Sequence, residues 1–320
     1  AKAYARTQNK TGVQKQIQIL EPFSQTLPSL AFTLATVCDT VGLTDETKRY
    51  LMTFERLSKE QKVLLDRLPR AYLSLGIIDY KQRHYEAAAD WFKQVDSSSE
   101  FFPQSRLLLA QSLAAEKKYD AAIDILAETK VVGKVKTEFL HKRAQILYEA
   151  GRTTKAYSAM KEALATDKKN ATLLFQCAIM ANELKKLDEA EKYLQDAIGY
   201  YPNEADFYNT LGYLWIDNNI KLKQARPLIE KALAMEPDNA AFLDSMGWLY
   251  FREGDLQQAQ NFLEQAVKKL NDKEILLHLV EVYQAQGQTA KAMEILRPML
   301  KENADDPVIN SLMDRLHLRF

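Results

Sequence analysis

Residues 205–272 read ADFYNTLGYLWIDNNIKLKQARPLIEKALAMEP and then DNAAFLDSMGWLYFREGDLQQAQNFLEQAVKKLND, which are two copies of one pattern. Gly212 corresponds to Gly247 at an offset of 35 residues, and Ala225 corresponds to Ala259 at an offset of 34. Apolar residues between these points recur at helical spacing, which predicts two helices and a turn in each copy. Glycine inside a helix costs about 1 kcal/mol relative to alanine. We therefore expect the small residues to mark places where two helices approach closely.

The same pattern extends over most of the chain. We expect repeats to start near Pro69, Pro103, Thr137, Ala171, Ala205, Ala240 and Lys273. A small residue stands early in each second helix, namely Ala88, Ala122, Ala156, Ala190, Ala225, Ala259 and Ala292. Another stands within most first helices, namely Gly76, Ala110, Ala144, Ala178, Gly212 and Gly247, with Val280 at this place in the last repeat.

This period and these small residues resemble the tetratricopeptide repeat (TPR) family over about three quarters of the chain. The resemblance implies an all-α protein, a right-handed α-solenoid of helix-turn-helix repeats. We expect three parts: an irregular helical segment with degenerate repeats at 1–68, seven repeats at 69–306, and a capping helix at 307–320. Within the first part we expect helices over 1–9, 11–23 and 29–41, another from Thr44, and an inserted helical segment over 58–68.

The composition excludes few functions, but it does not favour a function that depends on a strong net charge. The 320 residues include 43 basic and 43 acidic residues, so net charge does not point to nucleic acid or an anionic membrane. No apolar run is long enough to span a membrane. Because repeats in a solenoid contact only their neighbours, we expect Cys38 and Cys177 to be buried and unpaired.

The sequence offers no convergent chemistry, so we expect no catalytic residues, metal ligands or cofactor. The four histidines, His84, His141, His278 and His317, share no metal-ligand spacing, and we expect His278 and His317 at the surface. There is no phosphate loop and no nucleophile elbow. Catalysis needs groups that converge in a pocket, which favours a non-enzymatic protein.

In the TPR family the first helix of each repeat lines the concave face, so the resemblance implies a partner-binding groove there. Its inner positions are unusually apolar and aromatic between residues 145 and 251. The candidate groove residues are Gln145, Tyr148, Phe175, Ile179, Asn182, Asn209, Tyr213, Ile216, Asp244, Trp248 and Phe251. We expect Tyr213, Trp248 and Phe251 to form an exposed apolar strip, because exposed aromatic clusters often mark binding sites. The alternative is that this face is closed by its own packing. Trp215 should lie on the core side.

The segment FLDSMGWLYFREGDLQQA, residues 242–259, is similar to repeats of Gram-negative envelope TPR lipoproteins, some of which are adaptors for a carboxyl-terminal-processing protease. This resemblance implies a scaffold or adaptor that holds a partner peptide or helix, in the periplasm or attached to the outer membrane; a cytoplasmic location is the alternative. Two other functions stay open: an assembly factor for an envelope machine, and a sensor of small molecules or glycans. We expect protein partners, no nucleic acid, no membrane span, and oligomerisation through the open N-terminal end.

Overall fold

The structure is a computed structural model that describes residues 10–318, and all of its regular elements there are helical. Residues 1–9 and 319–320, including the helix expected over 1–9, lie outside the described residues. Contacts divide the chain into two units, residues 1–167 and residues 168–320. The three parts predicted from the sequence, bounded at 68 and 306, stay a prediction.

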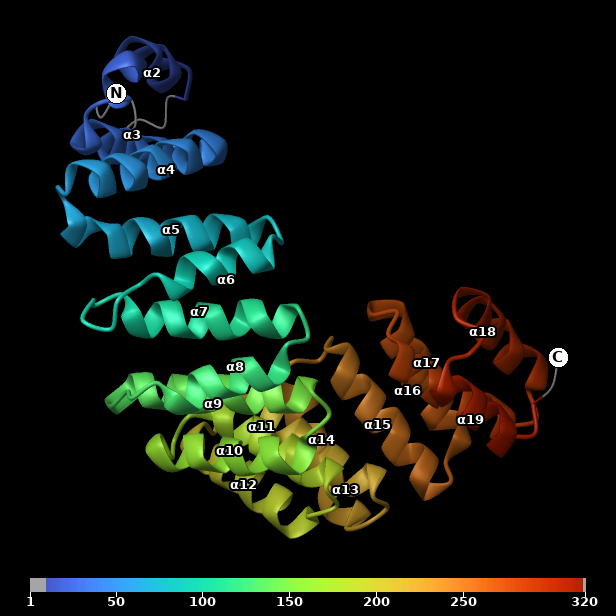
Figure 1. The fold of residues 1–320 in the computed structure, drawn as a ribbon. Coiled ribbons are helices and arrows are strands. Elements are labelled where there is room, and N and C mark those ends of the chain that lie inside the picture. Colours follow the sequence, from blue (N-terminus) through green and yellow to red (C-terminus); the bar gives the residue numbers. More distant parts are fainter. Residues whose placement is uncertain (1–9, 319–320) are drawn as a thin grey trace. The chain divides into compact units, whose positions relative to one another are not determined.

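The first unit holds nine α-helices and one short 3-10 helix in its described residues (Figure 1). These elements are α2 (Lys10–Ser24), α3 (Pro28–Thr40), α4 (Thr44–Gln61), η1 (Leu65–Arg67), α5 (Leu68–Lys81), α6 (Tyr85–Lys93), α7 (Phe102–Ala115), α8 (Tyr119–Glu128), α9 (Gly133–Glu149) and α10 (Thr153–Thr166).

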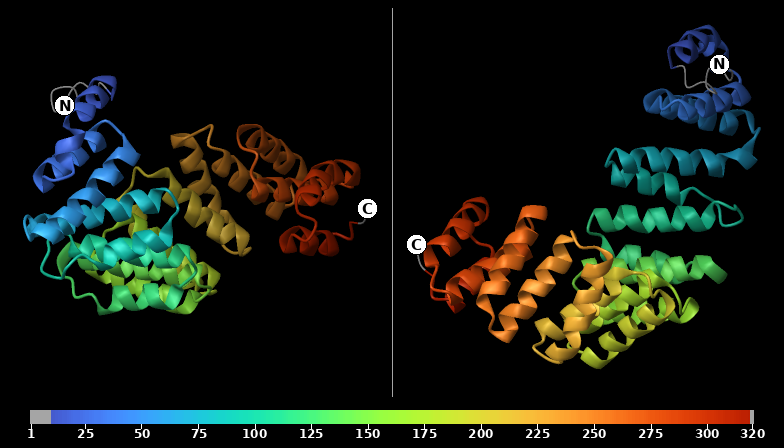
Figure 2. Two further views of the ribbon diagram at one scale, coloured as in Figure 1. Left: turned by 45° about the horizontal axis from the view of Figure 1, so that its top comes forward. Right: turned by 180° about the vertical axis from the view of Figure 1, so that it is seen from behind.

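In its described residues the second unit holds four further helix pairs and a last single helix. Its C-terminal helices, drawn orange to red, follow one another side by side in both further views (Figure 2). These helices are α11 (Ala171–Glu183), α12 (Leu187–Tyr200), α13 (Ala205–Asp217), α14 (Leu222–Met235), α15 (Ala240–Glu253), α16 (Leu256–Lys269), α17 (Lys273–Ala285), α18 (Thr289–Glu302) and α19 (Pro307–Arg315). The predicted starts at Ala171, Ala205, Ala240 and Lys273 are confirmed to the residue.

Small residues hold the two helices of a repeat together, as the sequence predicts. All seven alanines in the first turns of the second helices are 0% exposed. A Cβ atom on Gly247 would lie 2.7 Å from Cγ of Leu263 and 3.2 Å from the carbonyl oxygen of Ala259. On Gly212 it would lie 2.6 Å from Cδ1 of Ile229. Glycine at these two places therefore allows an approach that any side chain would block.

Two expectations for helix bounds are wrong. The segment 58–68 is not a helix of its own, because α4 continues to Gln61 and ends where Lys62 adopts a left-handed backbone with φ of 59°. Helix α9 begins at Gly133, four residues before the expected start at Thr137. The expected helices over 11–23 and 29–41 correspond closely to α2 and α3, and Gly42 makes the turn after α3 with φ of 70°.

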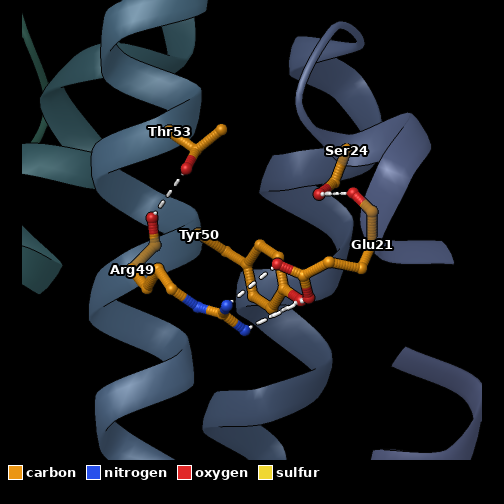
Figure 3. A network of polar contacts seen from close by, with 5 residues as sticks. All are labelled: Glu21, Ser24, Arg49, Tyr50 and Thr53. Atoms are coloured by element: carbon orange, nitrogen blue, oxygen red, sulfur yellow. Dashed lines mark hydrogen bonds and ion pairs between the residues drawn. The ribbon is translucent and has the colours of Figure 1, made fainter. Parts of the chain in front are cut away.

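Polar side chains join the irregular N-terminal helices to one another. Arg49 on α4 donates two hydrogen bonds to the carboxylate of Glu21 on α2, at 2.9 and 3.2 Å, and the Tyr50 hydroxyl donates to the same carboxylate (Figure 3). Ser24 turns back to bond the carbonyl oxygen of Glu21 at 2.7 Å. Since Tyr50 is fully buried, this network fixes α2 against α4.

A second network joins α4 to the first regular repeat. Asp79 on α5 is 1% exposed. Its carboxylate accepts hydrogen bonds from Nζ of Lys48 on α4 at 2.5 Å and from Nε1 of Trp91 on α6 at 3.1 Å. A buried carboxylate is tolerated when it is paired and hydrogen-bonded in this way. The network therefore fixes the place at which the irregular segment meets the repeats.

Both cysteines are buried and neither forms a disulfide, as the sequence predicts. Cys38 lies in α3 and Cys177 in α11, so they belong to different units. Burial raises the pKa of the Cys38 thiol to about 12. A thiol with so high a pKa is a poor nucleophile at neutral pH, which makes Cys38 a packing residue.

The contact between α15 and α16 can be tested by overfilling it. Ala259→Leu should lower the free energy of unfolding by about 1–3 kcal/mol, because Ala259 is fully buried at this close contact and leaves no room for the added atoms. Thermal melts followed by circular dichroism would show the change. Lys268→Ala, at an exposed position on the same helix, is the control and should melt like the parent. A parental melting curve for Ala259→Leu would show that the helix contact is not where we place it.

Candidate interaction face

The predicted groove residues do not form one surface of uniform exposure. Gln145 and Tyr148 lie on α9 in the first unit, and the other nine lie on α11, α13 and α15 in the second. Gln145 is half-buried and contacts His141 through Nε2 at 3.1 Å, while Tyr148 is 42% exposed. Only the nine residues of the second unit are therefore candidates for a common face.

Five of these nine, all on α11 and α13, are at least partly accessible. Ile179 is 38% exposed, and Phe175, Asn182, Asn209 and Tyr213 are half-buried. Phe175 lies against Phe207, with ring centroids 6.5 Å apart. The side-chain oxygen of Asn182 is bonded within the chain, because Oδ1 accepts a hydrogen bond from Nδ2 of Asn218 at 3.2 Å.

Three of the predicted groove residues are buried, which corrects the sequence-based prediction. Ile216 is 0%, Trp248 3% and Asp244 5% exposed. The alternative of a face closed by its own packing therefore holds at these positions. Trp215, expected on the core side, is 7% exposed and donates from Nε1 to Glu191 at 3.0 Å, so that prediction is confirmed.

Stacked rings close the face between α15 and α17. The Trp248 ring stacks on His278 with centroids 4.1 Å apart and on Phe251 with centroids 4.7 Å apart. The Arg252 guanidinium lies over the same indole at 4.8 Å. Trp248, Phe251 and His278 therefore form a packed cluster in which Phe251 is half-buried, and the expected exposed strip is not present.

A buried ion pair lies beneath this cluster. Nδ1 of His278 is 2.8 Å from Oδ1 of Asp244, and His278 is only 7% exposed, so its expected place at the surface is wrong. Burial acts to lower the pKa of His278, but the hydrogen bond and charge of Asp244, with the charges of Glu274 and Glu281, outweigh it and raise the pKa. His278 stands 34 residues after Asp244, one repeat further on. Comparing inner positions one repeat apart would have revealed the pair.

Tyr213 reaches across two repeats to the start of α17. Its hydroxyl donates to Oε1 of Glu274 at 2.5 Å, and its ring centroid lies 6.3 Å from that of His278. Burial and the nearby charges of Glu274 and Asp217 raise the pKa of Tyr213, so the hydroxyl stays protonated and acts as a donor. Two buried polar atoms nearby, Oδ1 of Asn209 and Nε1 of Trp248, have no hydrogen-bond partner in the described residues.

A groove of about 840 Å³ lies between α17 and α19. Leu277 and His278 line it from α17, and Val308 and Leu312 line it from α19. Within residues 10–318 no three His, Cys, Asp or Glu side chains gather as a metal site would require. In the same residues no helix is long and apolar enough to cross a membrane.

Replacing Trp248 measures how completely the face is closed. Trp248→Ala should lower the free energy of unfolding by about 3–5 kcal/mol, because it removes a large side chain from packed surroundings. Thermal melts of Trp248→Ala and Trp215→Ala should show losses of similar size. Tyr200→Ala, which removes a ring that is 44% exposed, is the control and should have a much smaller effect. A stable Trp248→Ala variant would mean that the indole is not packed as the structure has it.

The Asp244–His278 pair should make stability depend on pH. Because the pKa of folded His278 is raised, its stabilising contribution is complete below the unfolded value of about 6.5 and is lost as pH rises through the folded value. The melting temperature should therefore fall between pH 6 and pH 9. The double variant Asp244→Asn/His278→Gln keeps a hydrogen bond but not the titration, so its fall should be smaller. His317→Asn, at an exposed histidine, should follow the parent, and an equal fall in the double variant would refute the assignment.

Comparisons with known proteins agree with this architecture. A family model described as tetratricopeptide repeat matches residues 147–212, 221–275 and 250–316, about half of the chain. A TPR repeat-containing protein of Pseudomonas aeruginosa is 30% identical over 211 residues, which cover 66% of this chain and 36% of that protein. The chain thus spans about a third of the length of this relative.

Solved structures with similar folds are distant in sequence. A thermophilic TPR protein of Thermus thermophilus superposes with a TM-score of 0.51 at 20% identity, over 57% of this chain and 100% of that chain. A tetratricopeptide repeat protein of Parabacteroides merdae gives a TM-score of 0.53 at 14% identity, over 80% of this chain and 98% of that chain. These likenesses support the all-helical solenoid fold. Together with the family match and the buried small residues of every helix pair, they show that this chain belongs to the tetratricopeptide repeat family.

Proposed function

We propose that this chain is a non-catalytic adaptor that holds a segment of a protein partner against its first helices. TPR proteins are generally scaffolds for protein interactions, and the fold favours protein partners for this chain also. The observation that carries the proposal is the exposed apolar side chain at an inner position of a first helix. Ile179 on α11 is 38% exposed there, although the other inner positions around it are covered or hydrogen-bonded.

We further propose that the partner is a carboxyl-terminal-processing protease of the bacterial envelope. The support is the resemblance of residues 242–259 to envelope TPR lipoproteins that act as such adaptors. The adaptor would raise the effective concentration of substrates near the protease. It would contribute no chemistry, and binding geometry alone would set which substrates are cleaved.

The test is a charge placed on the proposed binding position. Ile179→Glu should weaken capture of the partner at least 10-fold, because a carboxylate would have to be desolvated in an apolar contact. Partner capture would be measured by crosslinking in native extract, followed by cleavage of a substrate by the purified protease with and without this chain.

The matched control is Met235→Glu, which introduces the same charge at the end of a second helix where the parent side chain is 37% exposed. Both variants should melt within a few degrees of the parent, because exposed substitutions change stability little. Equal capture by Ile179→Glu and the parent would refute binding at α11. Unchanged cleavage rates on adding the parent chain would refute the protease adaptor.

A further inference from the structure

Within the described residues, no side chain of α17 or α19 fills the groove between these two helices, which has a volume of about 840 Å³. Its apolar lining comes from Leu277, Pro307, Val308 and Leu312, and Val308 is 54% exposed. One repeat earlier the corresponding space, between α15 and α17, is filled by Trp248 and His278. The groove therefore leaves apolar surface free for a side chain of another molecule.

The charges around the groove are unbalanced. Its two cations are already neutralised within the chain: Arg315 makes two hydrogen bonds to Glu281, at 2.7 and 3.0 Å, and Lys273 pairs with Asp306 at 2.6 Å. In the described residues no cation pairs with Asp272 or Glu274, which also line the groove and are exposed. Among residues 10–318, the Asp272 carboxylate accepts a hydrogen bond from the backbone N–H of Glu274, and the Glu274 carboxylate accepts one from the Tyr213 hydroxyl.

One further carboxylate, Asp217 on α13, lies near the Tyr213 hydroxyl that bonds Glu274. Asp217 is exposed, and its side chain pairs with no cation in the part of the chain that the structure describes. Asp217 and Glu274 both contribute to the raised pKa of Tyr213, which shows that their charges act on the same place. The groove thus opens beside a rim that favours positive charge.

A buried histidine contributes an unused hydrogen-bonding atom to the groove. His278 is 7% exposed and lines the groove, and its Nδ1 is held by Asp244. Its Nε2, on the opposite edge of the ring, has no hydrogen-bond partner in the described residues and is not among the fully buried polar atoms. A peptide group can satisfy Nε2 in either protonation state, because it offers both an N–H donor and a carbonyl acceptor.

We infer that the groove between α17 and α19 binds a cationic peptide segment of a protein partner. An apolar side chain of the segment occupies the space over Leu277, Val308 and Leu312. Flanking lysine or arginine side chains pair with Asp272 and Glu274, and the segment's main chain bonds Nε2 of His278. This inference rests on the proposed function, since it names the chemistry of the partner that the scaffold holds.

Two synthetic peptides test the inference on the full chain. Both have a Leu-Val-Leu centre, and the centre is flanked by lysine pairs in one peptide and by glutamate pairs in the other. Fluorescence anisotropy should show the lysine peptide binding at least 10-fold more tightly than the glutamate peptide. Its affinity should fall as salt is raised, because exposed charge pairs are screened. Absent or equal binding of the lysine peptide would overturn the inference.

Variants then locate the binding. Asp272→Asn/Glu274→Gln should weaken binding of the lysine peptide at least 10-fold. Val308→Ser should weaken binding of both peptides about threefold. The matched control is Asp188→Asn/Asp196→Asn, which removes two exposed carboxylates from α12 and should leave affinity unchanged. Equal losses in the groove and control variants would place the peptide elsewhere and overturn the inference.

Sedimentation of the parent and the groove variants tests whether a second copy of this chain occupies the groove instead. A parent dimer that dissociates on Asp272→Asn/Glu274→Gln would assign the groove to a second copy of this chain and overturn the inference, whereas an unchanged mass supports it. The capture experiment with Ile179→Glu is independent of these results. If the peptide experiments refute binding in the groove, the proposed adaptor function is unaffected. The adaptor function is refuted only by the partner-capture and cleavage experiments.

Discussion

The close contact between the two helices of each repeat is the constraint on which the rest of the structure depends. In each of the seven repeats the fourth residue of the second helix is an alanine with no exposed surface, and in two repeats a glycine of the first helix faces it. Because a side chain at either place would push the helices apart, the spacing within a pair is fixed. Fixed pairs then set the positions of the inner residues of the first helices in each unit, which is what allows a repeat protein to present a surface of defined chemistry.

The inner positions of the second unit are used in two different ways. From α13 to α17 they bond one another: Asp244 holds His278, Trp248 stacks on it, and Tyr213 bonds Glu274. Such contacts stabilise the stack of first helices and leave little surface for a partner. On α11 the inner position of Ile179 remains exposed, and the groove between α17 and α19 remains open. Apolar surface is therefore exposed on both sides of the packed cluster.

The sequence predicted the fold well because the repeat period determines which residues touch within a pair. Four starts of first helices in the second unit agree exactly, and every alanine assigned to a helix contact is buried. The prediction failed where side chains of different repeats meet. Trp248 occupies a position that is exposed in a generic repeat, but His278 and Phe251 cover it here. Position within a repeat gives the direction of a side chain, and only the neighbouring repeat decides whether water reaches it.

The groove is open because α19 differs from the first helices that precede it. His278 stands 34 residues after Asp244 and meets it in a buried pair, whereas the residue 34 positions after His278 is Leu312. A leucine cannot bond Nε2 of His278, and the nine-residue helix α19 is shorter than the first helices it follows. The contact that closes the face between α15 and α17 therefore has no counterpart between α17 and α19. The same repeat geometry that buries Asp244 thus leaves Nε2 of His278 without a hydrogen-bond partner in the described residues, beside apolar surface and beside Asp272 and Glu274, which pair with no cation there.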